Sequence, residues 1–191
     1  MPRIPYPRPD QIDDEARRWL EGVPPFNVMR MLSYSAPALT GILSFGQGTI
    51  YSTQIDPVLR EVAIVRVGHL SRCAYELDAH NRWIAKLGFN AEKIKALEAD
   101  IRHPAFTDAE RAVLAFTDDI VNNVRASDTT LSELRRHLPD RQVIELILTV
   151  GCYRMVCMLL ETTGVDIETA DADQPAWKEW ESRIKMLKAT A

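Results

Sequence analysis

Apolar residues recur along most of this chain at the i, i+3, i+4 spacing of an amphipathic helix, and the alternating pattern of strands is rare. This pattern predicts an all-α protein. The first helix is expected over residues 10–20, where Gly22 and a Pro-Pro pair follow it. A second helix is expected to be capped by Asn27 and interrupted by Pro37. No long linker separates these segments, so we expect one domain over residues 1–191.

Start and stop signals divide the rest of the chain into further helices. Asp56 followed by Pro57 marks the start of one helix, and Gly88 is suited to end the next, which we expect to begin near Arg72. Asn90 is expected to cap a short helix. Two Thr-x-x-Glu capping boxes predict further helix starts. The boxes begin at Thr107 and Thr130, and the last two helices are expected from Asp140 to Gly164 and over 176–187.

The longest apolar stretch runs from Val143 to Leu160 and has the length of a transmembrane helix. It contains Glu145 and Arg154, which would be costly in lipid. We therefore expect a central buried helix, of the kind that a large helical core or an oligomer interface produces, and no membrane partner. Within the single domain we distinguish an N-terminal extension with its helices (1–55), a core (56–165) and a C-terminal tail helix (166–191).

Composition narrows the functional classes. A chain of 191 residues with 46% hydrophobic residues buries about 70% of its unfolded surface, so it needs no disulfide or structural metal to fold. The net charge of −4 argues against a nucleic-acid partner or an anionic membrane. Three cysteines without paired spacing do not form a disulfide framework, and the N-terminus lacks the apolar region of a signal peptide. These features predict a cytoplasmic protein.

Chemically reactive side chains gather on one predicted helix. Cys73, Glu76 and His80 stand at i, i+3 and i+7, which places them within about 60° of each other around the helix axis. Apolar neighbours continue this face, so it should point inward, where pKa values shift and proton transfer becomes possible. Glu61 reaches the same place if its helix packs antiparallel to this one.

Other interpretations of these residues stay open at this point. Glu76 and His80 are equally compatible with an ordinary hydrogen-bonded pair, and Cys73 with a small core residue. The set lacks a known metal-ligand spacing, so we expect no metal and no cofactor. Cys152 and Cys157 lie about 140° apart around their helix, so they do not form a redox pair or a metal pair with each other.

Three blocks in order resemble the carboxymuconolactone decarboxylase family, which includes the alkylhydroperoxidase D-like proteins. The blocks read L-R-E-x-A-I-x-R-V, then C-x-Y-E-x-x-x-H, then D-R-Q-V-I-E-L-x-L-T-V-G-x-Y-R-M-V. The resemblance covers roughly residues 56–165. It implies an alkylhydroperoxidase D-like multi-helical fold that assembles as a homo-oligomer (dimer, trimer or hexamer).

The redox branch of this family carries Cys-x-x-Cys, a histidine four residues after the second cysteine, and a glutamate twelve residues before the first. Cys73, His80 and Glu61 match three of these positions, whereas Glu76 replaces the second cysteine. A carboxylate neither attacks a peroxide nor resolves a sulfenate. A thiol-dependent peroxidase that uses Cys73 with an external thiol therefore stands as an alternative function.

The decarboxylase branch carries a glutamate four residues before the histidine, as Glu76 and His80 do here. This resemblance implies a cofactor-free, lyase-like enzyme acting on a small unsaturated lactone or carboxylic acid. We expect His80 to act as general acid/base, Glu76 as its partner and Glu61 as a supporting group. A non-catalytic oligomeric helical protein is the third alternative. The candidate substrate-binding residues are Arg66, Arg72 and Tyr75.

Overall fold

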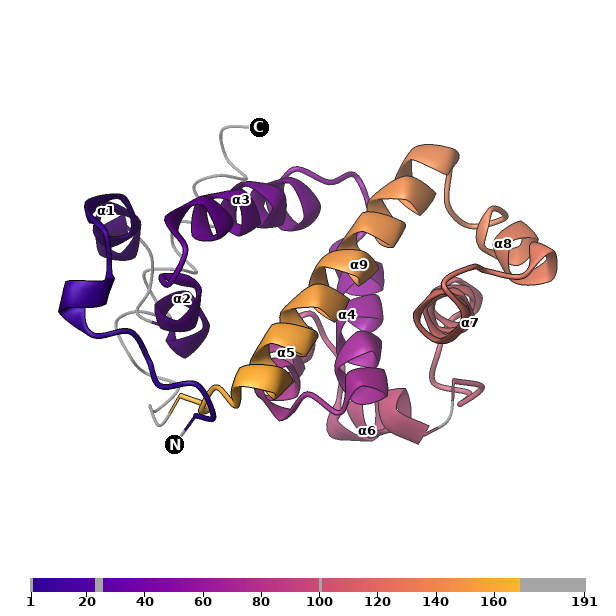
Figure 1. Cartoon of the computed structure of the whole chain (residues 1–191). Helices are drawn as coiled ribbons and strands as arrows, with labels where there is room; N and C mark the ends of the chain where they lie inside the picture. The colour runs from indigo at the N-terminus through magenta and orange to yellow at the C-terminus, as the bar shows by residue number, and fades with distance from the viewer. Residues whose placement is uncertain (1, 23–25, 100, 169–191) are drawn as a thin grey trace. The chain divides into compact units, whose positions relative to one another are not determined.

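The computed structural model describes residues 2–22, 26–99 and 101–168, and these residues form helices and no strand (Figure 1). The all-α prediction is confirmed. Contacts within the chain define two compact units, one made of Met1–Ser52 with Leu160–Ala191 and the other of Thr53–Leu159. The sequence predicted one domain, in which an N-terminal extension ends at residue 55. That boundary lies close to the division between the two units at Ser52 and Thr53. The predicted helix over 176–187 lies outside the described residues.

The described part of the first unit contains three short helices before the end of α9 (Asp140–Thr163). Asn27 was expected to cap the second helix, but it is the first helical residue, and its side-chain Nδ2 donates to the carbonyl of Asp166 at 2.9 Å. Pro37 separates this helix from the next, as predicted, because proline is tolerated in the first turn of a helix and not in its interior. The helices are α1 (Asp14–Gly22), α2 (Asn27–Leu32) and α3 (Ala36–Gly46), followed by a turn of π-helix over Gln47–Tyr51.

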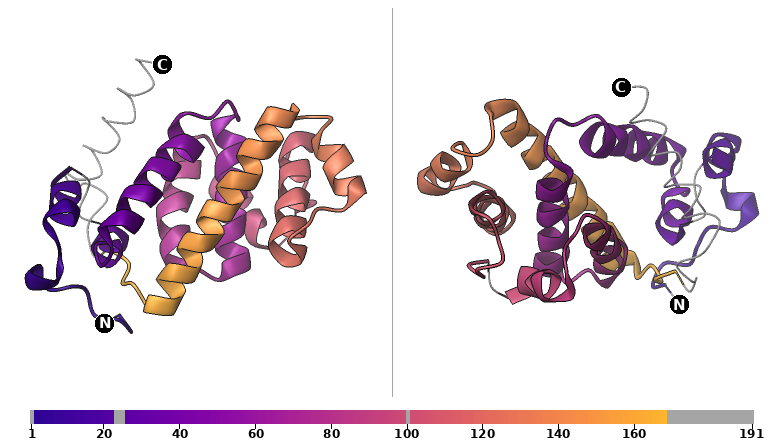
Figure 2. Two further views of the ribbon diagram at one scale, coloured as in Figure 1. Left: turned by 45° about the horizontal axis from the view of Figure 1, so that its top comes forward. Right: turned by 180° about the vertical axis from the view of Figure 1, so that it is seen from behind.

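The second unit is built around α4, which contacts α5, α6 and α7. A continuous run of α4, Arg60 to Val65, is buried, so this helix has no solvent-facing side over nearly two turns. The views in Figure 2 show α9 passing alongside α4 and α5. The helices of this unit are α4 (Pro57–Ser71), α5 (Ala74–Lys86), α6 (Ala91–Ala99), α7 (Asp108–Asn123), α8 (Asp128–Leu134) and α9 (Asp140–Thr163). Helix α9 belongs to this unit as far as Leu159, and its last residues belong to the first unit.

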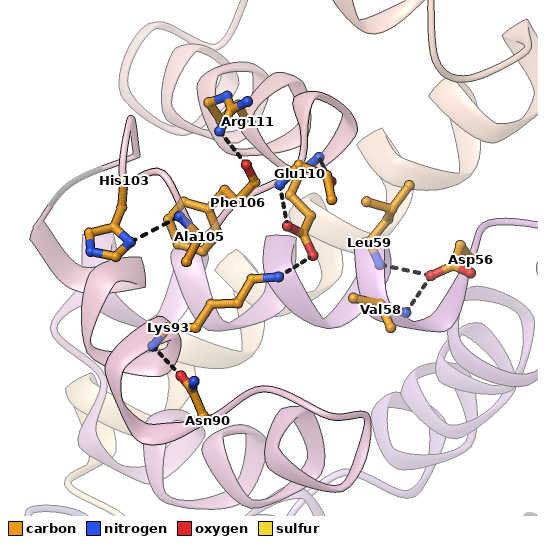
Figure 3. A network of polar contacts seen from close by, with 11 residues as sticks. Asp56, Val58, Leu59, Asn90, Lys93, His103, Ala105, Phe106, Glu110 and Arg111 are labelled. Carbon is orange, nitrogen blue, oxygen red and sulfur yellow. Dashed lines mark hydrogen bonds and ion pairs between the residues drawn. The ribbon is translucent and has the colours of Figure 1, made fainter.

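Local caps set most of the helix starts in this unit (Figure 3). The Asp56 carboxylate accepts hydrogen bonds from the backbone N–H groups of Val58 and Leu59 at 2.8 and 3.3 Å. Thr107 and Glu110 form the predicted capping box, in which each side chain accepts from the other's backbone N–H. Such caps are worth about 1 kcal/mol each because they satisfy N–H groups that have no partner within the helix.

Two predicted starts are displaced. The prediction of a capping box that begins at Thr130 was wrong. Ser127 caps α8 instead, and its Oγ accepts a hydrogen bond from the backbone N–H of Thr130. The helix expected to begin near Arg72 begins at Ala74, because Arg72 adopts a left-handed conformation (φ 53°) and ends α4. Gly88 follows α5 with φ 105°, a conformation that glycine adopts without strain, as predicted.

Helix α9 is long and apolar enough to cross a membrane by length and composition alone. Glu145 near its start accepts hydrogen bonds from the backbone N–H groups of Gln54 and Ile55, so this carboxylate has a structural role in the protein. One side of α9 is buried and the other carries exposed apolar side chains. The buried side chains include Val143, Leu146, Val150, Tyr153 and Cys157, and the exposed ones include Ile144, Ile147, Leu148, Met155 and Met158. That these exposed side chains are covered in a homo-oligomer stays a prediction.

Candidate active site

A close approach of α4 and α5 creates the site. The two helices are joined by Arg72 and Cys73, and the Cys73 N–H donates to the carbonyl of Gly68 at 2.9 Å. A Cβ on Gly68 would lie 3.0 Å from Cδ2 of Leu77, tighter than ordinary packing allows. Glycine at this position therefore lets α5 fold back along α4, which brings Glu61 opposite the end of the predicted reactive face.

His80 lies between two carboxylates. Its Nδ1 is 2.7 Å from Oε2 of Glu61 on α4, and its Nε2 is 3.4 Å from Oε2 of Glu76 on α5. The side chains are nearly buried: His80 is 13% exposed, Glu61 is 6% exposed and Glu76 is 8% exposed. Tyr153 of α9 packs edge-on against the imidazole, with ring centroids 4.9 Å apart. The structure thus brings together the three residues for which acid–base roles were predicted.

The surroundings of His80 favour its charged form. Burial lowers the pKa of an imidazole, but the nearby carboxylates of Glu61 and Glu76 outweigh this effect and raise the pKa of His80 above its usual value. The Arg60 guanidinium acts in the opposite direction. Arg60 itself is nearly buried, and its Nη2 lies 3.6 Å from Oε1 of Glu61. When His80 is protonated, the cationic side chains of Arg60 and His80 therefore lie next to the carboxylates of Glu61 and Glu76, so that positive and negative groups alternate through the site.

The raised pKa of His80 predicts how stability depends on pH. Because the folded protein binds this proton more tightly than the unfolded chain, the stabilisation from His80 is fully present below about pH 6.5, the usual histidine pKa. It is lost as the pH rises through the higher pKa of the folded state. Urea unfolding between pH 6 and 9 should show a fall in unfolding free energy that is absent in His80→Gln, and parallel curves for the two proteins would contradict it.

Cys73 contacts a residue that the sequence did not connect with it. Its thiol is buried and shares a hydrogen bond with the thiol of Cys157 on α9. Cys157 also contacts the hydroxyl of Ser71, which accepts a 2.6 Å hydrogen bond from Nη1 of Arg154. The sequence analysis compared the positions of Cys152 and Cys157 on their own helix only, so it did not predict that Cys157 meets Cys73. Tyr153 in the third block of the family resemblance and Cys157 directly after that block are four residues apart on one helix face, and this spacing was the available signal.

The predicted binding residues lie in other surroundings. Arg66 makes a two-pronged ion pair with Asp118 of α7 at 2.6 and 2.8 Å, and its Nη1 donates to the carbonyls of Leu97 and Glu98 at 2.9 and 2.7 Å. Its guanidinium therefore joins α4 to α6 and α7 and is not directed at His80. Arg72 is exposed at the end of α4.

Tyr75 is buried beside Glu76 in the first turn of α5. Arg60, which was not among the predicted binding residues, supplies the cation next to Glu61 instead. Within the described residues, no group of three or more His, Cys, Asp or Glu side chains is arranged to hold a metal ion.

Comparisons with known proteins agree with this architecture. The chain is 25% identical over 101 residues to the uncharacterized protein YdfG of Bacillus subtilis (strain 168), a match that covers 52% of this chain and 69% of YdfG. It superposes on an uncharacterized peroxidase-related protein from Silicibacter sp. TM1040 with a TM-score of 0.76 and 18% identity, over 88% of this chain and 92% of that one. The debrominase Bmp8 in complex with 2,3,4-tribromopyrrole gives a TM-score of 0.68 and 15% identity, over 95% and 96%.

The two structural matches show a shared fold. The family assignment has its own support in the sequence, because residues 36–119 match the model of the carboxymuconolactone decarboxylase family. That segment contains α4 and α5 with Arg60, Glu61, Glu76 and His80, whereas Tyr153 of α9 lies outside it. The sequence match and the common fold support the assignment of this chain to the carboxymuconolactone decarboxylase and alkylhydroperoxidase D-like superfamily.

Proposed function

We propose that this protein is a cofactor-free enzyme that moves a proton to or from carbon in a small unsaturated lactone or carboxylic acid. The observation that carries the proposal is the position of His80 between the carboxylates of Glu61 and Glu76. A histidine with a raised pKa holds a proton near neutral pH and releases it to a sufficiently basic carbon. The family match supports a decarboxylation as the reaction.

The reaction divides into two steps that suit these side chains. Loss of CO₂ from a carboxylated unsaturated lactone leaves an electron pair that is delocalised through the ring into the lactone carbonyl. The His80 imidazolium then delivers a proton to the ring carbon, and the resulting neutral imidazole takes up a proton from water. Glu61, at 2.7 Å from Nδ1, fixes the ring orientation and stabilises the imidazolium between turnovers.

Arg60 is suited to bind the substrate. Its guanidinium lies beside Glu61 in a nearly buried position, where the attraction to a carboxylate is stronger than in water. We assign to Arg60 the role that the sequence suggested for Arg66 and Arg72, because Arg66 is directed at Asp118 and Arg72 is exposed. Tyr153 packs against the imidazole with the two ring planes 89° apart.

The cost of burying this cluster argues against a purely structural role. Removing two carboxylates and an imidazolium from water costs several kcal/mol per ion, and apolar side chains of similar volume stabilise a helical core as well or better. A compact set of nearly buried titratable groups with a perturbed pKa is typical of a functional site. This reasoning favours an enzyme over a non-catalytic helical protein.

The test is to incubate the protein with carboxymuconolactone in deuterated water. We expect CO₂ release together with one deuterium bound to carbon in the product, because the proton donated by His80 exchanges with solvent. The same protein unfolded in urea provides the control. The absence of CO₂ release would contradict the proposed substrate class, and release without deuterium on carbon would contradict the role of His80.

A further inference from the structure

The carboxylate of Glu61 is shared between two basic side chains. Its Oε2 lies 2.7 Å from Nδ1 of His80, and its Oε1 lies 3.6 Å from Nη2 of Arg60. The three side chains are nearly buried, so little water screens the charges from one another. A change of charge at Arg60 is therefore felt at His80, with Glu61 between them.

The two contacts of Glu61 differ in strength. The contact with His80 is a hydrogen bond, whereas 3.6 Å to Arg60 is too long for one. A hydrogen bond between a guanidinium and a carboxylate is usually about 2.8 Å long, so a ligand carboxylate that binds Arg60 makes a closer contact than Glu61 does. Such a ligand brings a further negative charge to the site and leaves the hydrogen bond between Glu61 and His80 in place.

Charged and titratable groups from three helices face His80. Arg60 and Glu61 come from α4, Glu76 from α5 and the phenol of Tyr153 from α9. The carboxylates of Glu61 and Glu76 raise the pKa of His80, and the positive charge of Arg60 lowers it. A ligand carboxylate at Arg60 compensates that positive charge, so it favours the protonated imidazole.

Helix α6 also packs against α4 and α5, and its charged side chains are directed elsewhere or exposed. They are Lys93, which binds Glu110 at 2.8 Å, Glu92, which lies 3.6 Å from His103, Glu98, which acts on His69, and the exposed Lys95. The charge at His80 is therefore governed by the groups of α4 and α5.

We propose that binding of a substrate carboxylate at Arg60 makes His80 take up a proton, and that Glu61, which contacts both side chains, connects the two events. This inference rests on the proposed function, which assigns the substrate carboxylate to Arg60. It adds that the substrate itself loads the proton that the reaction consumes. A neutral imidazole that donates Nδ1–H to Glu61 takes the proton from water at Nε2, the nitrogen that faces Glu76.

Thermodynamic linkage makes this effect reciprocal. If the ligand favours protonation of His80, then protonation of His80 strengthens ligand binding by the same factor. The Kd of an anionic ligand should therefore rise as the pH rises through the pKa of His80, which lies above its usual value. Because a single proton is taken up, the rise is at most about tenfold per pH unit.

The test uses γ-carboxy-γ-butyrolactone, a saturated lactone acid without the double bond that would take up the electron pair left by CO₂. Isothermal titration calorimetry between pH 6 and 9 measures its Kd, and buffers of different ionisation enthalpy give the number of protons taken up. We expect a Kd that rises with pH and an uptake that approaches one proton per chain. A Kd that is independent of pH, together with a heat that is independent of the buffer, would overturn the proposal.

The uncharged γ-butyrolactone is the matched control ligand, because it has the same ring and no carboxylate. We expect it to bind, at the same concentrations, without any proton uptake or not to bind. Proton uptake equal to that of the lactone acid would also overturn the proposal, since the ligand charge would then play no part.

Variants locate the proton and the anchor. His80→Gln is expected to bind the lactone acid with a Kd that is independent of pH and without proton uptake, whereas the control His103→Gln keeps the uptake. Arg60→Gln is expected to lose affinity for the acid. Equal proton uptake in His80→Gln and His103→Gln, or an unchanged Kd in Arg60→Gln, would overturn the proposal. The titrations of the unmodified protein require no variant to fold.

The coupling and the proposed reaction fail in different ways. A protein that releases CO₂ in deuterated water but binds the lactone acid without proton uptake keeps the proposed function and loses the coupling. Binding with proton uptake but without CO₂ release supports the coupling and contradicts the reaction. No binding of the lactone acid overturns both the coupling and the role of Arg60 as anchor, and CO₂ release then still tests the reaction.

Discussion

Replacing His80 with glutamine is expected to lower kcat for CO₂ release from carboxymuconolactone by about 10²–10⁴-fold, the usual contribution of a positioned general acid or base. Glutamine has a similar size, and its amide can donate to Glu61 in place of Nδ1–H. It does not titrate, so the variant keeps the polar contact but loses the transferable proton. The measurement is steady-state CO₂ release with both proteins at saturating substrate.

His103→Gln is the matched control for this substitution. His103 lies in the segment between α6 and α7, where its Nε2 is 3.6 Å from the exposed carboxylate of Glu92. We expect this variant to keep the full kcat. An unchanged kcat in His80→Gln, or equal losses in the two variants, would show that the imidazole between Glu61 and Glu76 is not the proton donor.

Replacing Arg66 with methionine is expected to destabilise the protein by about 3 kcal/mol, because removal of one partner leaves the other charge partly buried and unpaired. Arg66 and Asp118 are 11% and 23% exposed, and the same guanidinium also binds two carbonyls at the end of α6. The variant loses all four hydrogen bonds. Urea unfolding should show a lower midpoint with an unchanged slope.

Arg82→Met serves as the control for this effect. Arg82 also binds an aspartate, Asp78, at 2.8 Å, but these two side chains are 40% and 34% exposed on the surface of α5. An exposed ion pair of this kind is worth about 0–1 kcal/mol. Similar losses in Arg66→Met and Arg82→Met would contradict the structural role assigned to Arg66.

Features that depend on neighbouring residues could be predicted from the sequence. Asp56 caps α4 and Gly88 ends α5, because capping geometry is decided within a few residues. Glu76 and His80 share a helix face for the same reason. Glu61 joined them under the stated condition of antiparallel packing, which the close approach at Gly68 makes possible.

Features that depend on contacts between distant segments were missed or misassigned. Helical spacing placed Cys157 relative to Cys152 but gave no information on Cys73, which meets it only after α9 packs against the junction of α4 and α5. Arg66 was chosen as a substrate anchor because it is a cation near the motif. Its partner, Asp118, lies on α7, and no local pattern indicates that pairing.

The two nitrogens of His80 are held unequally, at 2.7 Å from Glu61 and 3.4 Å from Glu76. The second distance is close to the outer limit of hydrogen bonding, so a substrate atom displaces little binding energy when it approaches Nε2. The ring is thus held more tightly at Nδ1 than at Nε2. In the proposed reaction a planar ring carbon at Nε2 would receive its proton on one face only, so the fold that fixes the imidazole would also fix the side from which the new C–H bond forms.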